Sequence, residues 1–76
     1  PLGWEHALEA EAQKLLATGQ PDVWDVLNRR FESQLIRTAL VATHGRRMEA
    51  AQRLGIGRNT ITRKIQELGL DAADEG

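Results

Sequence analysis

Three side chains near the C-terminal end of the sequence, Arg58, Asn59 and Arg63, are of types that can read DNA bases directly. An arginine guanidinium can donate two hydrogen bonds to O6 and N7 of guanine, and an asparagine amide can pair with N6 and N7 of adenine. Because successive residues of a helix are about 100° apart, Asn59 and Arg63 fall on one face, with Arg58 at the helix start. This spacing predicts a base-reading surface; the alternative is an ordinary solvated polar face.

Five more polar side chains flank these three and are predicted to hold DNA phosphates. They are Arg46, Arg47, Thr60, Thr62 and Lys64. Residues 44–68 carry a net charge of +4, whereas residues 1–43 carry −2 and residues 69–76 carry −3. A basic segment between acidic flanks is typical of a chain that faces a nucleic acid. A solvated charged surface would show the same asymmetry, so the charges alone do not decide between the two interpretations.

Few side chains in the sequence could support catalysis or hold a metal. Cysteine is absent, and the two histidines, His6 and His44, are 38 residues apart and have no ligand-like spacing to a carboxylate. No phosphate-binding loop of the type G-x-x-x-x-G-K-[ST] is present. We therefore expect no enzyme activity, no metal and no cofactor.

A helix-turn-helix pattern is predicted to position the polar side chains. Two short helices, over residues 47–54 and 58–68, are joined by a turn over residues 55–57. Ala51 is the small residue needed where the second helix crosses the first, and Gly55 tolerates the positive φ of the turn. The predicted apolar core between the helices consists of Leu54, Ile56, Ile61 and Ile65. This apolar pattern directs the polar side chains outward, which favours base reading over the solvated-face interpretation.

Two longer helices are predicted before this motif. The first covers residues 4–18, and its apolar stripe consists of Trp4, Leu8, Ala12, Leu15 and Leu16. Gly19 and Pro21 separate it from the second helix, which runs from residue 21 or 22 to residue 44 and has Gly45 as its C-terminal cap.

The second helix has apolar residues on more than one side, which indicates burial on more than one side. A chain of 76 residues buries only about 60% of its unfolded surface, and this one has no disulfide to stabilise it. We therefore expect a homodimer formed by residues 4–44. The candidate interface residues are Trp24, Leu27, Phe31, Ile36 and Leu40.

The predicted fold class is all-α, with four helices in a single domain over residues 4–70. Residues 1–3 are interpreted as a possible cloning scar and residues 71–76 as a disordered acidic tail. No apolar run approaches the roughly 18 residues of a membrane span, and no signal peptide is present. These features predict a cytoplasmic protein that has no membrane partner.

Residues 35–70 resemble the Fis-type helix-turn-helix, most clearly in the run from residue 55 to residue 70. Within this type, the runs Gly57-Arg58-Asn59-Thr60, Thr62-Arg63-Lys64 and Glu67-Leu68-Gly69 are most similar to the C-terminal domains of NtrC-like nitrogen regulators. This family consists of bacterial enhancer-binding activators of sigma-54 RNA polymerase.

The resemblance implies that the two helices before the motif form a dimer and that base reading falls on Arg58, Asn59 and Arg63. Gly57 stands where Fis itself has a polar contact residue, so the likeness to Fis is weaker there. Any contact with sigma-54 RNA polymerase would involve domains of a parent protein that these residues do not contain.

The predicted function is sequence-specific, dimeric binding to a palindromic DNA site, an inverted-repeat enhancer. The chain would be the C-terminal domain of an NtrC-like response regulator of a two-component system, activating sigma-54-dependent transcription for nitrogen assimilation. One alternative is an architectural, Fis-like DNA-bending protein with loose specificity. Another is a helical dimerisation or protein-interaction module.

Overall fold

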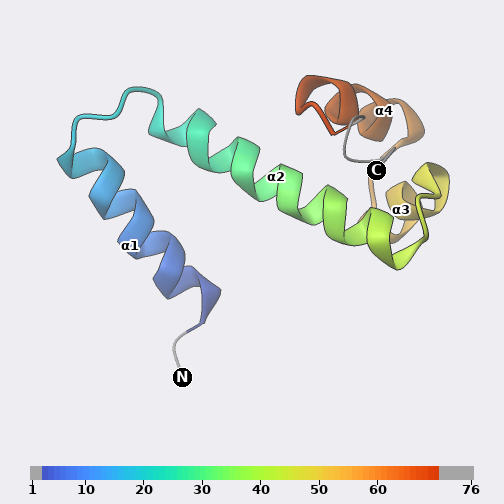
Figure 1. Cartoon of the computed structure of the whole chain (residues 1–76), viewed down its shortest axis with the longest axis horizontal. Coiled ribbons are helices and arrows are strands. Elements are labelled where there is room, and N and C mark those ends of the chain that lie inside the picture. The colour runs from blue at the N-terminus through green and yellow to red at the C-terminus, as the bar shows by residue number, and fades with distance from the viewer. Residues whose placement is uncertain (1–2, 71–76) are drawn as a thin grey trace.

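A computed structural model of the chain describes residues 3–70, and these residues form four α-helices without a β-strand (Figure 1). The helices are α1 (Trp4–Ala17), α2 (Val23–Ala42), α3 (Arg47–Leu54) and α4 (Arg58–Glu67). The predicted all-α class with four helices is confirmed. The predictions for residues 1–2 and for the acidic tail, residues 71–76, lie outside the described residues.

The long helix α2 connects two parts of the molecule (Figure 1). Helix α1 runs back beside the first half of α2, whereas α3 and α4 lie at its C-terminal half. Helix α3 packs on both α2 and α4. The helix-turn-helix is thus fixed to the end of the helix that was predicted to dimerise.

The apolar core joins α2 to the helix-turn-helix. Its buried residues are Ile36, Ala39 and Leu40 of α2, Ala50 and Ala51 of α3, Ile61 and Ile65 of α4, and Leu70. Ile61 and Ile65 are fully buried, and burial of a side chain of this size contributes roughly 1.5–3 kcal/mol. Leu54 and Ile56 of the predicted core pack against this cluster but are only half-buried.

Two residues predicted to lie in the dimer interface belong to this core instead. Ile36 is 3% exposed and Leu40 is 6% exposed in a single chain. They face the same chain's α3 and α4 because they occupy the side of α2 on which the helix-turn-helix packs. The assignment of Ile36 and Leu40 to an interface with a second chain is therefore corrected.

All four helices end with the same backbone hydrogen bonds, those of a Schellman motif. At the end of α4, the amide of Leu70 donates to the carbonyl of Ile65 over 2.9 Å, and the amide of Gly69 donates to Gln66 over 3.2 Å. The residue in the left-handed conformation is a glycine at α1, α3 and α4, namely Gly19, Gly55 and Gly69. Leu70 is thereby returned to the core, where it is 1% exposed.

The end of α2 differs from the prediction that Gly45 caps a helix reaching residue 44. The helix ends at Ala42 with Thr43 as its cap, and His44 adopts the left-handed conformation with φ 55°. The amide of Gly45 then donates to the carbonyl of Leu40 over 2.7 Å. Gly45 is therefore one position beyond the left-handed residue of the motif, although its own φ is also positive, at 82°.

Thr43 is buried where α2 meets α3, with 1% of its surface exposed. Its hydroxyl oxygen lies 2.9 Å from the carbonyl oxygen of Ala39 and 3.2 Å from that of Arg46. The hydroxyl proton can be donated to either carbonyl, so the side chain connects the last turn of α2 to the residue that precedes α3.

The remaining boundaries differ from the prediction by one or two residues. Helix α1 ends at Ala17 rather than residue 18, and α4 ends at Glu67 rather than Leu68. Helix α2 starts at Val23 because Asp22 is a left-handed residue, with φ 55°.

Candidate nucleic-acid interface

Helix α4 presents one apolar face and one polar face. Ile61 and Ile65 point into the core and are 0% exposed. The side chains of Arg58, Asn59 and Arg63 are exposed. Asn59 and Arg63 are four residues apart, so they occupy neighbouring turns of the same face. The residues predicted to read bases are thus on the outer surface at and near the start of α4.

Two of these side chains have no internal partner within residues 3–70. Neither Arg58 nor Asn59 donates a side-chain hydrogen bond or forms an ion pair with the described chain. Arg63 forms a weak ion pair with Glu67. Its Nε lies 3.8 Å from Oε2 of Glu67, and the two side chains are 62% and 54% exposed. An exposed ion pair of this kind contributes about 0–1 kcal/mol, so a base or phosphate can replace Glu67 at little cost.

The turn that precedes α4 is held by backbone hydrogen bonds and by one left-handed glycine. Gly55 has φ 78°, and the amide of Ile56 donates to the carbonyl of Ala51 over 3.0 Å. An added Cβ on Gly55 would meet no atom within 4 Å, so the backbone conformation, not space, favours glycine here. Ala51 is 3% exposed in the core that α3 shares with α4, as expected for the small residue at a helix crossing.

Lys64, one of the predicted phosphate ligands, has a partner inside the chain. Its Nζ lies 2.9 Å from Oε2 of Glu32 on α2, and the two side chains are only 26% and 23% exposed. Lys64 therefore points back toward α2, away from the exposed face of α4. The periodicity of α4 alone did not reveal this because the partner lies 32 residues earlier in the chain.

The other predicted phosphate ligands are placed differently from one another. Arg46 is exposed, and its Nη1 lies 3.6 Å from Oε1 of Glu49. Arg47 is half-buried at the first position of α3, and Thr60 is half-buried in α4. Thr62 is exposed, but its hydroxyl donates to the carbonyl of Arg58 over 3.0 Å. Binding a phosphate through the Thr62 hydroxyl would require this internal bond to break.

Sequence reasoning missed the role of Glu49, which lies among these arginines. Its Oε2 accepts a hydrogen bond of 3.1 Å from Nη2 of Arg53, while its Oε1 faces Arg46. The i, i+4 spacing of Glu49 and Arg53 could have indicated the pair. Glu49 places a negative charge beside two cations and so lowers the net positive charge of α3.

Residues 29–68 match the model of a protein family described as "Bacterial regulatory protein, Fis family". The match covers more than half of the 76 residues and includes all of α3 and α4. The chain belongs to the Fis family of bacterial regulatory proteins. As a Fis-family helix-turn-helix, it is a DNA-binding domain and not an enzyme.

Relatives of this Fis-family chain include proteins described as "DNA-binding transcriptional regulator NtrC". The chain is 39% identical over 71 residues to NtrC of Escherichia coli (strain K12) and to NtrC of Klebsiella pneumoniae, which is 93% of the chain and 15% of each relative. It is 44% identical over 48 residues to NtrC of Rhizobium meliloti (strain 1021), which is 63% of the chain and 10% of that relative.

The chain therefore spans about 10–15% of the length of the curated relatives it matches, and it is homologous to the C-terminal region of NtrC. The expected resemblance to the Fis type and to NtrC is confirmed. No solved structure matches the chain significantly.

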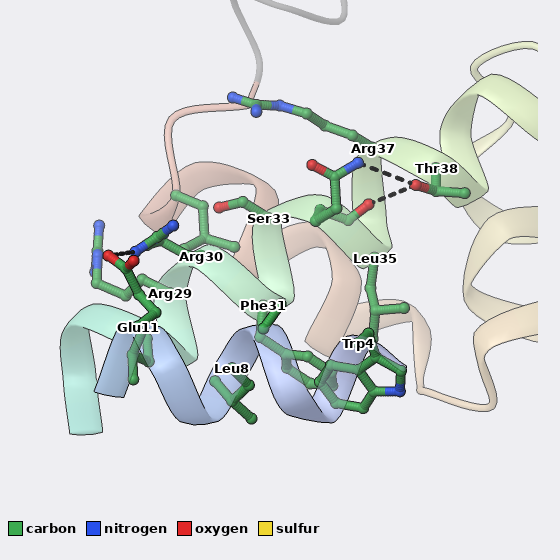
Figure 2. A pocket seen from close by; sticks show the side chains of 14 residues that line it. Trp4, Leu8, Glu11, Arg29, Arg30, Phe31, Ser33, Leu35, Arg37 and Thr38 are labelled. Carbon is green, nitrogen blue, oxygen red and sulfur yellow. Dashed lines mark hydrogen bonds and ion pairs between the residues drawn. The ribbon is translucent and has the colours of Figure 1, made fainter. Parts of the chain in front are cut away.

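The Fis-family chain has a second exposed surface, an apolar groove between α1 and α2 (Figure 2). We define the apolar groove by Trp4, Leu8, Leu27, Phe31 and Leu35. The rings of Trp4 and Phe31 are stacked, with centroids 6.4 Å apart and an angle of 19° between their planes. At one end of the groove, Nη1 of Arg30 lies 3.0 Å from Oε2 of Glu11.

The side chains of this groove are poorly covered by the chain itself. Trp4 is 62% exposed, Phe31 48% and Leu35 44%. Trp24, another predicted interface residue, is 86% exposed at the start of α2, and Leu27 is half-buried. Thus Trp24, Leu27 and Phe31 remain available for a second chain, in contrast to Ile36 and Leu40.

Residues 3–70 contain no group of three or more histidine, aspartate or glutamate side chains that could hold a metal ion. None of the helices in this part of the chain has the length and apolar character needed to cross a membrane.

Proposed function

We propose that the chain is a sequence-specific DNA-binding domain that acts as a homodimer on an inverted-repeat site. The observation that carries this proposal is the division of α4, in which two fully buried isoleucines face the core while Arg58, Asn59 and Arg63 remain exposed. Residues at the start of the second helix of a helix-turn-helix are the ones that enter the major groove.

Base reading is assigned to Arg58, Asn59 and Arg63. Each correctly paired side chain of this kind contributes about 1–3 kcal/mol to discrimination between bases. Arg46, Arg47, Thr60 and Thr62 are proposed as phosphate ligands at the edges of the same face. Phosphate contacts fix the position of the protein on DNA but do not distinguish sequences.

Dimerisation is assigned to α1 and α2, with Trp24, Leu27 and Phe31 in the interface. Contiguous exposed apolar side chains, such as those of the apolar groove, are typical of interaction sites. A second copy of the chain is the proposed partner, because a C2 dimer would place two copies of α4 on opposite sides of one axis. The two helices would then enter successive major grooves about 34 Å apart.

The similarity to NtrC indicates what kind of larger protein the chain could belong to. By analogy with NtrC, which is described as a DNA-binding transcriptional regulator, we assign the chain to the C-terminal part of a response regulator. In this proposal the parent protein activates sigma-54-dependent transcription for nitrogen assimilation in the bacterial cytoplasm, and the chain supplies the recognition of its enhancer.

Competition binding at a fixed salt concentration tests the proposal. The chain is bound to a labelled inverted-repeat duplex and competed with the same duplex or with random DNA. Specific recognition predicts an affinity ratio of about 10³ or more. A ratio near one would instead support an architectural DNA-bending protein, and no binding to either duplex would support a protein-interaction module.

A further inference from the structure

Two polar contacts connect recognition helix α4 directly to α2. Nζ of Lys64 lies 2.9 Å from Oε2 of Glu32, and Nη2 of Arg29 donates a hydrogen bond of 3.1 Å to the carbonyl oxygen of Glu67. The backbones of α2 and α4 otherwise approach each other little, since α3 is the helix that packs on both. The two contacts are therefore the main polar connections between these helices in residues 3–70.

The position of these contacts gives them control over the angle of α4. The buried part of α2 begins at Ile36, whereas Glu32 lies one helical turn before it and Arg29 nearly two turns before it. Apolar packing is non-directional, so the core alone permits small rotations of α4. A charged pair at hydrogen-bond distance on the side nearer the N-terminus of α2 opposes such rotations because it requires a defined geometry.

The carboxylate of Glu32 is held in place from its own helix as well. Nδ2 of Asn28 lies 3.4 Å from the same Oε2 that accepts the hydrogen bond from Lys64. Glu32 and Lys64 are each about three-quarters buried, and this reduces the screening of their attraction by solvent and salt. The pair is thus less exposed than the ion pairs Arg46–Glu49, Arg53–Glu49 and Arg63–Glu67 on the DNA-facing helices.

We infer that Glu32 and Lys64, supported by Arg29, are positioning residues that fix the orientation of α4 relative to α2. Because α2 belongs to the proposed dimer interface, this orientation determines which half-site spacing the dimer accepts. The inference rests on the proposed function, because spacing matters only to a dimer on an inverted repeat. Adding one base pair between half-sites moves them apart by about 3.4 Å and rotates them by about 35°. A rigid connection between α2 and α4 penalises that change, whereas a loose one accommodates it.

The test measures affinity for three inverted repeats: the preferred spacing and the same half-sites moved one base pair closer or farther. Spacing selectivity is the ratio of affinity for the preferred duplex to that for the altered duplexes. Glu32→Gln and Lys64→Met should each lower this ratio by at least about threefold, as expected for loss of this ion pair in both subunits. Arg29→Met, which removes the second contact, should lower the same ratio.

A charge swap separates positioning from phosphate binding. Glu32→Lys combined with Lys64→Glu re-forms the pair in reverse and should recover most of the wild-type spacing selectivity. If Lys64 held a phosphate, Lys64→Glu would weaken binding to every duplex whatever residue stood at position 32, and the inference would be overturned. Glu9→Gln removes one exposed carboxylate of α1 and serves as the control with unchanged selectivity.

The outcomes also separate this inference from the proposed function. A wild-type chain that prefers one spacing, with folded single variants that keep the wild-type ratio, overturns the inference alone. A wild-type chain that binds an inverted repeat no better than a single half-site overturns the proposed function and the inference together. Circular dichroism at the assay temperature shows which variants are folded.

Discussion

The amide of Ile56 donates a 3.0 Å hydrogen bond to the carbonyl of Ala51, and this bond closes the turn between α3 and α4. It forms only because Gly55, the residue between α3 and Ile56, adopts φ 78°. The orientation of the recognition helix therefore depends on a backbone conformation that residues with a Cβ disfavour.

Gly55→Ala should lower the free energy of unfolding by about 1–2 kcal/mol because it forces a Cβ into the left-handed region. Gly57→Ala is the matched control: Gly57 has φ −77°, and its added Cβ would lie 3.9 Å from Oγ1 of Thr60, an ordinary contact. Urea denaturation measures both variants. Equal stability of the two would show that the turn does not require a left-handed residue.

Thr43→Val should destabilise the chain by about 0.5–1.5 kcal/mol because it removes the buried hydroxyl between α2 and α3. Thr38→Val on the same helix is the control, since the Thr38 hydroxyl donates to the carbonyl of Gln34 in the same i−4 pattern but is exposed. That change should stay within about 0.5 kcal/mol. Thermal melting of both variants checks the difference, and equal losses would contradict the proposed contact.

His44→Gly should stabilise the chain by about 0.5–1 kcal/mol. His44 holds the left-handed position that glycine occupies at the ends of the other three helices, and relief of its strain exceeds the entropy that glycine adds to the unfolded state. The same substitution at His6, inside α1, should destabilise the chain because glycine is a poor helix former. Urea denaturation measures the stability of both variants. If His44→Gly were also destabilising, the strain argument would be wrong.

Phe31→Glu should convert the proposed dimer into a folded monomer because it places a charge in the apolar groove. Val41→Glu adds the same charge to α2 at a residue that is 77% exposed and outside the groove, so it should leave the dimer intact. Sedimentation equilibrium at about ten micromolar distinguishes the two states. A wild-type chain that is a folded monomer under these conditions would contradict the interface assignment.

Local patterns in the sequence were sufficient to predict the four helices and most of their ends. The glycines and the apolar spacing located α3 to the residue and α4 to within one residue, since a left-handed glycine follows the end of each helix. The end of α2 was missed because a histidine, His44, takes the position that glycine usually holds.

Long-range contacts account for the other errors. Ile36 and Leu40 are apolar residues of a helix with two apolar sides, and periodicity cannot tell which side meets the same chain. Lys64 was grouped with the exposed cations because its partner Glu32 lies on a different helix. The outward direction of Arg58, Asn59 and Arg63 could be predicted because it follows from their spacing to Ile61 and Ile65 on a single helix.

The most direct test of the central claim compares Arg63→Ala with Arg46→Ala on the inverted-repeat site and on random DNA. Arg63→Ala should cost about 1–3 kcal/mol per subunit on the specific site and much less on random DNA, because it removes a base contact. Arg46→Ala should weaken binding to both duplexes alike and reduce the magnitude of the log–log salt slope by about one per lost contact. If both variants lost specific and non-specific affinity in the same proportion, the assignment of base reading to the exposed face of α4 would be wrong.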